Sequence, residues 1–390
     1  MKFSFAFIFI VFCLFQACTS FRRDRSYRYD FSVAEIDSSE LSGFCSIIAG
    51  FNREFDARVG STIPGAVILF IRDGEIYFKQ AFGYKNLGSG TRMTTDAIFR
   101  VALISKTVSA IGVMRLVEYG VISLDEPVAN LMKNLQIPDT AFYSQSISFS
   151  NLLTHTSGIS DHMFNFLAYS TEHDLQYIFD THEPSVFVRA PGERFLYSNV
   201  GFHVLLLAME GATGKNFTDL MAYYVLRPMK MQNSTFEHNL EVETRLATPY
   251  DRNLFMHSPL LEKLFAASGG LYTTAGDLAH LVIQMMMVYH GKENNFILSQ
   301  DSLKKMFSRE VIAFFSDTMT SYWGLGFSIE QHSGNIFLHG HRGTTRGYNT
   351  AYWFCLDSKD GIIILTNGTR GHSELIEPLR LEWIKYLISR

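Results

Sequence analysis

The stretch FRVALISKTVSAIGVMRLVEYGVISLDEPV, from Phe99 to Val128, decides both the expected fold and the expected site. It predicts a helix that carries Lys106 in its first turn and ends near Gly120, because glycine commonly follows the last helical residue. Leu103 stands three residues before Lys106, and that spacing puts two helical side chains on one face, about one turn apart. Ser105 is expected about 200° around the helix from Leu103, as a packed or helix-starting serine.

Strand patterns lie on both sides of this helix. GAVILFIRDGEIYFKQAFGYKN, Gly65 to Asn86, predicts two strands around the turn RDGE. Strands return from Ser321 in SYWGLGFSIEQ, NIFLHGH, GYNTAYWFCLD and DGIIILTN, and helical patterns occupy residues 41–59 and the C-terminus. We therefore predict an α/β fold: one antiparallel sheet built from both outer segments, flanked by terminal helices, with an inserted all-helical lobe at approximately 125–260.

The chain begins with MKFSFAFIFIVFCLFQACTS, in which a lysine precedes an apolar run and small residues follow it, the form of a secretory signal. We interpret residues 1–18 as a signal or lipoprotein leader, 19–40 as a tether and 41–390 as the folded domain. Cys18 is the expected lipidation site, with a simple cleaved signal or an uncleaved N-terminal anchor as alternatives. The prediction is an exported protein, periplasmic or membrane-anchored in the cell envelope.

Composition argues against several other classes. The formal net charge is −4 at pH 7 without a dense basic stripe, so no nucleic-acid partner is expected. Cys45 and Cys355, the cysteines beyond the leader, form no disulfide framework, and two buried thiols are expected. His339 and His341 alternate along one strand, but no acid–histidine pair follows at zinc-hydrolase spacing. Neither a metal nor another cofactor is therefore expected.

Over about residues 41–388 the chain resembles the superfamily of serine β-lactamases, penicillin-binding proteins and class C-type esterases. Each short motif is weak alone, but six in the family's order make a chance match very improbable. They are the hairpin from Gly65, the stretch FRVALISKTVSAIGVMRLVEYGVISLDEPV, LLTHTSGI from Leu152, YSN from Tyr197, SGGLYTTAGDLA from Ser268 and GHRGTTRGY from Gly340.

The resemblance implies a catalytic set. The family uses a serine nucleophile and a lysine three residues later, and Lys106 matches that lysine. Tyr197 matches the family's general base or proton shuttle, and the resemblance implies that Lys106 lowers the pKa of its phenol. Asn199 would bind a substrate amide or carbonyl and steady Lys106. Without the resemblance, the same YSN segment is a loop whose Ser198 or Asn199 caps the next helix.

The last of these motifs, GHRGTTRGY, completes the implied pocket. His341 matches an edge-strand residue that faces the ligand, and Gly343 would allow a close backbone approach. The implied oxyanion hole uses the backbone N–H groups of Leu103 and Thr344. Arg342 stands where the family has Thr or Ser.

Leu103 is the main departure from the family. Phe99 to Ala102 match the aromatic–Arg–apolar–small frame before the family's serine, which places Leu103 at the serine position. A leucine has no oxygen or sulfur that attacks a carbonyl. The first hypothesis is therefore an acylation-impaired protein that binds a small-molecule, peptide-like, ester-like or β-lactam-like ligand. The alternatives are an active esterase, D-amino-acid peptidase or β-lactamase with a nucleophile such as Ser105, and a purely structural envelope protein.

Overall fold

The structure is a computed structural model that describes residues 62–132, 146–161, 175–256, 265–292, 297–316 and 319–390. All of them belong to one compact unit, Ile47–Arg390. The expected leader and tether, Cys18, Cys45 and the helix expected at 41–59 lie outside the described residues. Among those described, no helix has the length and apolar character needed to span a membrane.

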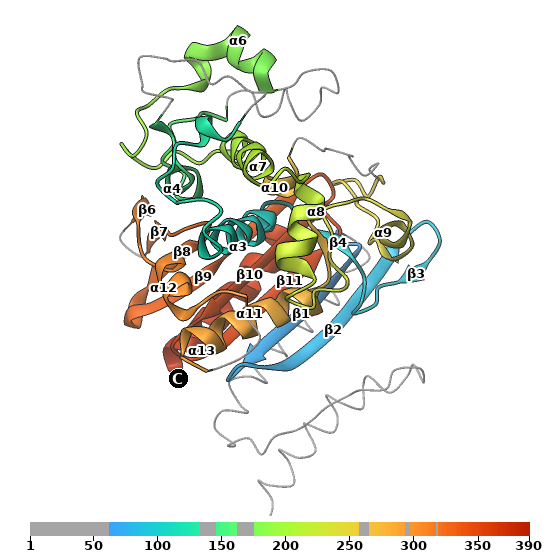
Figure 1. Cartoon of the computed structure of the whole chain (residues 1–390). Helices are drawn as coiled ribbons and strands as arrows, with labels where there is room; N and C mark the ends of the chain where they lie inside the picture. Colours follow the sequence, from blue (N-terminus) through green and yellow to red (C-terminus); the bar gives the residue numbers. More distant parts are fainter. Residues whose placement is uncertain (1–61, 133–145, 162–174, 257–264, 293–296, 317–318) are drawn as a thin grey trace, which may run out of the picture. The chain divides into compact units, whose positions relative to one another are not determined.

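A nine-stranded antiparallel sheet forms the centre of this unit (Figure 1), as predicted. Its order is β3-β2-β1-β11-β10-β9-β8-β7-β6. The two outer segments of the chain meet where β1 pairs with β11, with Ala66 opposite Thr366. The strands are β1 Gly65–Arg72, β2 Glu75–Asn86, β3 Thr91–Arg92, β6 Val311–Phe315, β7 Thr320–Trp323, β8 Ser328–His332, β9 Ile336–Thr345, β10 Tyr348–Cys355 and β11 Asp360–Thr366.

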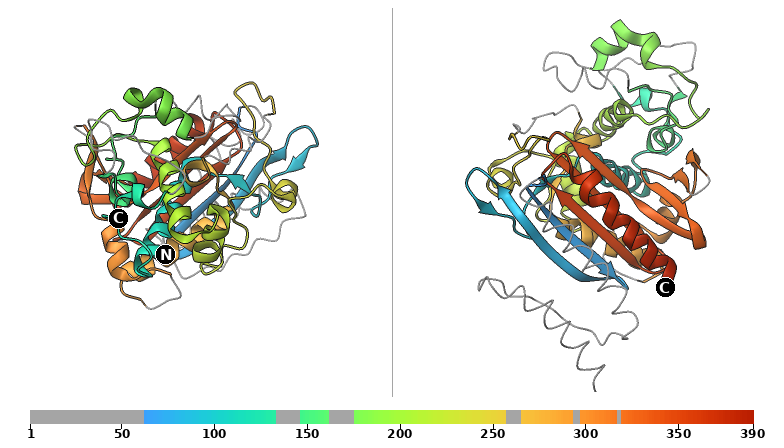
Figure 2. Two further views of the ribbon diagram at one scale, coloured as in Figure 1. Left: turned by 45° about the horizontal axis from the view of Figure 1, so that its top comes forward. Right: turned by 180° about the vertical axis from the view of Figure 1, so that it is seen from behind.

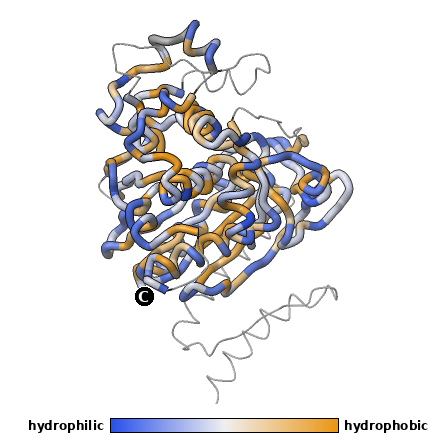
Figure 3. Tube along the Cα trace, viewed as in Figure 1, coloured by the Kyte–Doolittle hydropathy of each residue, from blue (hydrophilic) through white to orange (hydrophobic). Residues whose placement is uncertain are grey.

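Helices cover both faces of the sheet. α3 (Ser105–Glu118) and α11 (Ala275–Tyr289) lie on one face, and α13 (Glu377–Ser389) crosses the other, as the view from behind in Figure 2 shows. Every residue of β10 and β11 is buried, and hydrophobic residues gather in the central strands and the helices over them (Figure 3). Burial of this apolar surface on both faces is the main force that holds the layers together.

Between the two strands of a small second sheet, β4 (Phe99–Arg100) and β5 (Tyr272–Thr273), the described elements are helical. They are η2 Val128–Asn130, α4 Phe149–Leu153, α6 Leu175–Val186, α7 Asn199–Thr213, α8 Phe217–Met221, η4 Ala222–Leu226, α9 Leu240–Arg245 and α10 Ala266–Gly269, besides α3 and the short turn before it. α12 Gln300–Met306 follows α11. The pairing of β4 with β5 brings the start of α3 next to the segment that follows α10.

Strand β6 was not predicted from the sequence. Its five residues, VIAFF, are all apolar and show no alternation, and periodicity cannot assign so short a run to strand or helix. The strand is the last in the sheet, and it exposes Ile312, Phe314 and Phe315.

Candidate active site

The site is built around the turn that precedes α3. Leu103 lies in a 3-10 turn, Ala102–Ile104, and not in α3 itself, and its side chain is half-buried. Ala102 has a φ of +50°, a conformation that residues other than glycine seldom adopt. Such strain is often found at functional sites.

Strands β9 and β10 both contact this turn and hold it in place. The hydroxyl of Thr350 on β10 donates to the carbonyl of Val101 at 2.9 Å. A Cβ on Gly343 would lie 2.1 Å from the same carbonyl, so only glycine fits between strand and turn. The close approach seen at Gly343 is to the chain's own backbone, whereas the approach to a ligand stays a prediction. Because Val101 and Gly343 touch, the expected oxyanion donors Leu103 and Thr344 come from neighbouring segments.

Ser105 has a structural position. Its side chain is fully buried, and its Oγ donates to the carbonyl of Ala102 at 2.6 Å and accepts from the N–H of Leu271 at 2.9 Å. The hydroxyl therefore connects the helix start to the residue that precedes β5, which is the packed role expected for a serine off the Leu103 face.

Lys106 is also fully buried and bonded. Its Nζ donates to Oδ1 of Asn199 at 2.5 Å and to the carbonyl of Ser268 at 3.1 Å. Burial lowers the pKa of the amine from 10.5 to about 7, although the negative charge of Asp161 opposes this shift. The structure thus brings Lys106 and Asn199 together, and near neutral pH both the charged and the neutral form of the amine are populated.

Asp161 is a site residue that was not identified from the sequence. It accepts from the N–H and Nδ2 of Asn199, both at 2.6 Å, and from the N–H of Val200 at 3.1 Å. Ser198 is the N-cap of α7 and accepts from the N–H of Gly201 at 2.8 Å. The YSN segment is therefore both a helix cap and part of the site, and an acid at a helix N-terminus is favourably placed.

Tyr197 differs from expectation in its electrostatics. Burial, and then the negative charge of Asp161, raise the pKa of its phenol well above 10. The expected lowering by Lys106 is wrong, because the amine lies over the ring face, 5.1 Å from its centre, and desolvation dominates. The hydroxyl is buried and has no hydrogen-bond partner among the described residues.

The ring of His341 is neutral and its tautomer follows from its contacts. Nδ1 lies 2.6 Å from the carbonyl of Arg342, so Nδ1 carries the proton and donates it. Burial and the charge of Lys106 lower the pKa of the imidazole to about 3. Nε2 is therefore an acceptor, and within the described part of the chain this buried atom has no partner.

Two aromatic residues near Tyr197 were not assigned to the site from sequence. The ring of His155, in the loop after α4, lies 4.2 Å from that of Tyr197. Trp323, at the end of β7, lies 4.8 Å from His155 and 5.4 Å from His341. The histidine in THTSG offered a weak signal, whereas Trp323 is remote in sequence and only the sheet order brings it here.

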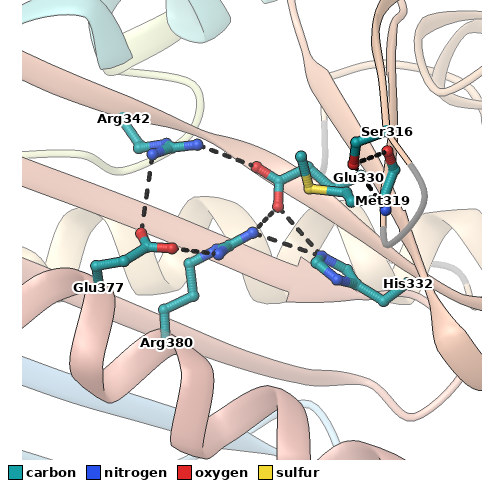
Figure 4. Close-up of polar contacts among 7 residues, drawn as sticks. All are labelled: Ser316, Met319, Glu330, His332, Arg342, Glu377 and Arg380. Atoms are coloured by element: carbon teal, nitrogen blue, oxygen red, sulfur yellow. Dashed lines mark hydrogen bonds and ion pairs between the residues drawn. The ribbon is translucent and has the colours of Figure 1, made fainter.

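The side chain of Arg342 lies on the opposite side of the sheet from the site. Its guanidinium lies 3.6 Å from Glu330 and 3.8 Å from Glu377, where Arg380 of α13 also binds both acids (Figure 4). Alternation along β9 sends Arg342 to the α13 face while its neighbour His341 packs on Trp323. This departure from the family pattern therefore affects the back of the sheet. His339 packs between Phe307 and Phe354, and the described residues hold no cluster suited to a metal ion.

Several known proteins are similar to this chain in amino-acid sequence. Penicillin-binding protein 4 of Amycolatopsis lactamdurans is 25% identical over 330 residues, 82% of this chain and 85% of that protein. Esterase EstB of Burkholderia gladioli is 31% identical over 237 residues, 56% and 59% of the two chains. The D-alanyl-D-alanine-carboxypeptidase/endopeptidase AmpH of Escherichia coli K12 is 25% identical over 241 residues, 58% of each chain, so less than two thirds of that relative is spanned.

A solved structure and a family profile are also similar to this chain. The octameric penicillin-binding protein homologue from Pyrococcus abyssi superposes with a TM-score of 0.71 at 25% identity, covering 83% of this chain and 73% of that one. The profile of the family described as Beta-lactamase matches residues 51–384. The chain belongs to the Beta-lactamase family.

Proposed function

We propose that this chain is a hydrolase-like binding protein of the cell envelope, impaired in acylation because Leu103 occupies the nucleophile position of its family. The observation that carries the proposal is a leucine in the 3-10 turn one turn before Lys106, whose amine is bonded to Asn199. An acyl-enzyme requires an oxygen or sulfur nucleophile, and loss of that atom abolishes most of the rate in a concerted site.

The remaining groups suit a carbonyl-containing ligand. Leu103 and Thr344 would offer backbone N–H donors, Lys106 a nearby positive charge and Asn199 an amide. Tyr197, His341, His155 and Trp323 each bury a polar atom that lacks a partner in the described residues. A buried unpaired group costs about 1–3 kcal/mol, so a ligand or ordered water that pairs these atoms would stabilise the fold. The peptidase and esterase relatives support a peptide-like, ester-like or β-lactam-like ligand.

An active hydrolase is the second candidate. Ser105 is a poor nucleophile here, since its hydroxyl is buried and bonded on both sides. The pKa of Lys106, about 7, favours a different route in which the neutral amine activates a water molecule at neutral pH.

Covalent labelling tests the proposal. The purified wild-type protein, incubated with a fluorescent penicillin and with a fluorophosphonate, is expected to give no adduct by intact mass. A ligand of the proposed class is still expected to raise the melting temperature, because binding to the folded state alone stabilises it. Leu103→Ser is expected to gain a stable adduct on the new serine.

Matched variants separate the alternatives. A wild-type adduct that disappears in Ser105→Ala would establish a nucleophile at Ser105 and overturn the proposal. Ester turnover without an adduct, lost in Lys106→Met, would support the water route. Absence of both labelling and any thermal shift, with Tyr197→Phe unchanged, would leave a structural protein.

A further inference from the structure

His155 makes three contacts with Tyr197 and its two neighbours in the chain. Its carbonyl accepts from the N–H of Leu196 at 2.7 Å, and its Nδ1 accepts from the N–H of Ser198 at 3.1 Å. Its ring lies against the Tyr197 ring, with centres 4.2 Å apart and planes 32° apart. One residue thus fixes the backbone before and after Tyr197 and also one face of its ring.

The segment that carries His155 is itself firmly held. The N–H of Thr156 donates to Asn151 of α4 at 2.8 Å, and the N–H of Gly192 donates back to the carbonyl of Thr156 at 2.7 Å. A Cβ on Gly158 would lie 2.0 Å from the carbonyl of Arg189, so the two segments are in direct backbone contact. A side chain on such a support is preorganised.

His155 has a backbone conformation that needs a reason. Its φ is +56°, which a residue other than glycine adopts at a cost of about 1 kcal/mol or more. The left-handed turn allows one residue to present both its carbonyl and its ring to the segment 196–198.

The tautomer of His155 is also determined. Because Nδ1 accepts a hydrogen bond from a backbone N–H, it carries no proton, and the proton of the neutral ring is on Nε2. Burial, and then the positive charge of Lys106, lower the pKa of the imidazole well below 6.5, which keeps this form. A second proton would sit on Nδ1 and oppose the N–H of Ser198.

We propose that His155 is the positioning residue of Tyr197, and that its Nδ1 acceptor and its ring face together set where the phenol hydroxyl lies relative to Lys106 and His341. The proposal deepens the function proposed above and rests on it for the meaning of Tyr197. It adds a group whose Nδ1 and ring face act through Tyr197.

Two substitutions separate the components of this role. His155→Asn keeps an acceptor near the Nδ1 position, and asparagine tolerates a positive φ, but the ring is lost. His155→Phe keeps a ring and loses the acceptor, so the N–H of Ser198 is left buried and unpaired. His203→Phe is the matched control, because His203 is equally buried and its ring lies 6.0 Å from that of Phe265.

The decisive readout is the fluorine NMR signal of meta-fluorotyrosine placed only at Tyr197. His155→Phe is expected to shift and broaden this signal, His155→Asn to restore part of the wild-type line shape, and His203→Phe to leave it unchanged. In the Leu103→Ser background, His155→Phe is expected to slow acylation by about tenfold or more, with His155→Asn closer to the parent, since small displacements of a reacting group carry large rate costs.

The outcomes are distinct. If His155→Phe lowers the melting temperature as His203→Phe does but leaves the Tyr197 signal and the acylation rate unchanged, His155 only fills space and the proposal is wrong. If Leu103→Ser gives no acylation, the proposed function of the site fails, while the fluorine signal still decides whether His155 sets Tyr197.

Discussion

Asn199 links the amine of Lys106 to the carboxylate of Asp161. Its Oδ1 accepts from Lys106 at 2.5 Å and its Nδ2 donates to Asp161 at 2.6 Å, so the two charges fix the orientation of the amide. The same carboxylate accepts the backbone N–H groups of Asn199 and Val200 at the start of α7. The helix start and the charge of the lysine therefore depend on one acid.

Asp161→Asn is expected to lower the free energy of unfolding by about 1–3 kcal/mol, because charge-assisted bonds at a helix N-terminus are replaced by weaker neutral ones. Urea denaturation of the purified protein measures this loss. Asp219→Asn is the control, since Asp219 lies in the first turn of the short helix α8 and accepts from Asn216 in an exposed bond. Equal losses in the two variants would contradict the role given to Asp161.

Because the amine of Lys106 is buried, the stability of the protein is expected to change with pH in the alkaline range. Its pKa in the folded protein, about 7, lies below the ordinary 10.5, so between these values the unfolded chain binds more protons than the folded one. The contribution of Lys106 to stability therefore rises with pH across this window. The difference in free energy of unfolding between wild type and Lys106→Met is expected to grow in favour of wild type by a few kcal/mol at most between pH 7 and 10. If this difference stays constant with pH, the pKa of Lys106 in the folded protein is not lowered and the prediction is wrong.

His339 provides a corresponding test at acid pH, where stability again rises with pH. Burial lowers its pKa to about 3, so below its ordinary value of 6.5 the unfolded chain takes up a proton that the folded protein does not. Stability is therefore lost as the pH falls from about 6.5 toward 3. His339→Phe is expected to reduce the loss of melting temperature between pH 7 and 4.5, because phenylalanine fits beside Phe354 and cannot titrate. It also removes a buried nitrogen that has no partner in the described residues. Identical pH profiles for the two proteins would refute this.

The sheet and the helix that carries Lys106 could be predicted from the sequence for a physical reason. The hairpin at Gly65, the buried strands of the last third and the helix after Lys106 each carry their own periodic or turn signal. The pairing of β1 with β11 then joins both outer segments in one sheet, and that single sheet was predicted. Asp161, His155 and Trp323 could not be placed in this way. Their roles depend on contacts between segments far apart in the chain, and a single acid or aromatic residue has no periodic signature.

The pKa of Tyr197 shows the same limit. From sequence, the nearest known charge was Lys106, which alone would lower the pKa of the phenol. In the structure the hydroxyl is fully desolvated and Asp161 adds a negative charge, and these effects dominate. The sign of a pKa shift depends on burial and on every nearby charge, and neither can be read from a motif.

The charge network under β9 provides the last prediction. Glu330 is buried and binds Arg380 and His332, while Arg342 reaches it from a more exposed position with 44% of its side chain accessible. Glu330→Gln would leave the buried guanidinium of Arg380 without its closest counter-charge, and removal of one partner of a buried pair costs about 3–5 kcal/mol. Arg342→Ala breaks longer, more exposed contacts and is expected to cost about 1 kcal/mol or less. Urea denaturation of both variants measures the two losses. If Arg342→Ala proved as damaging as Glu330→Gln, the exposed arginine and not the buried pair would be what fastens α13 to the sheet.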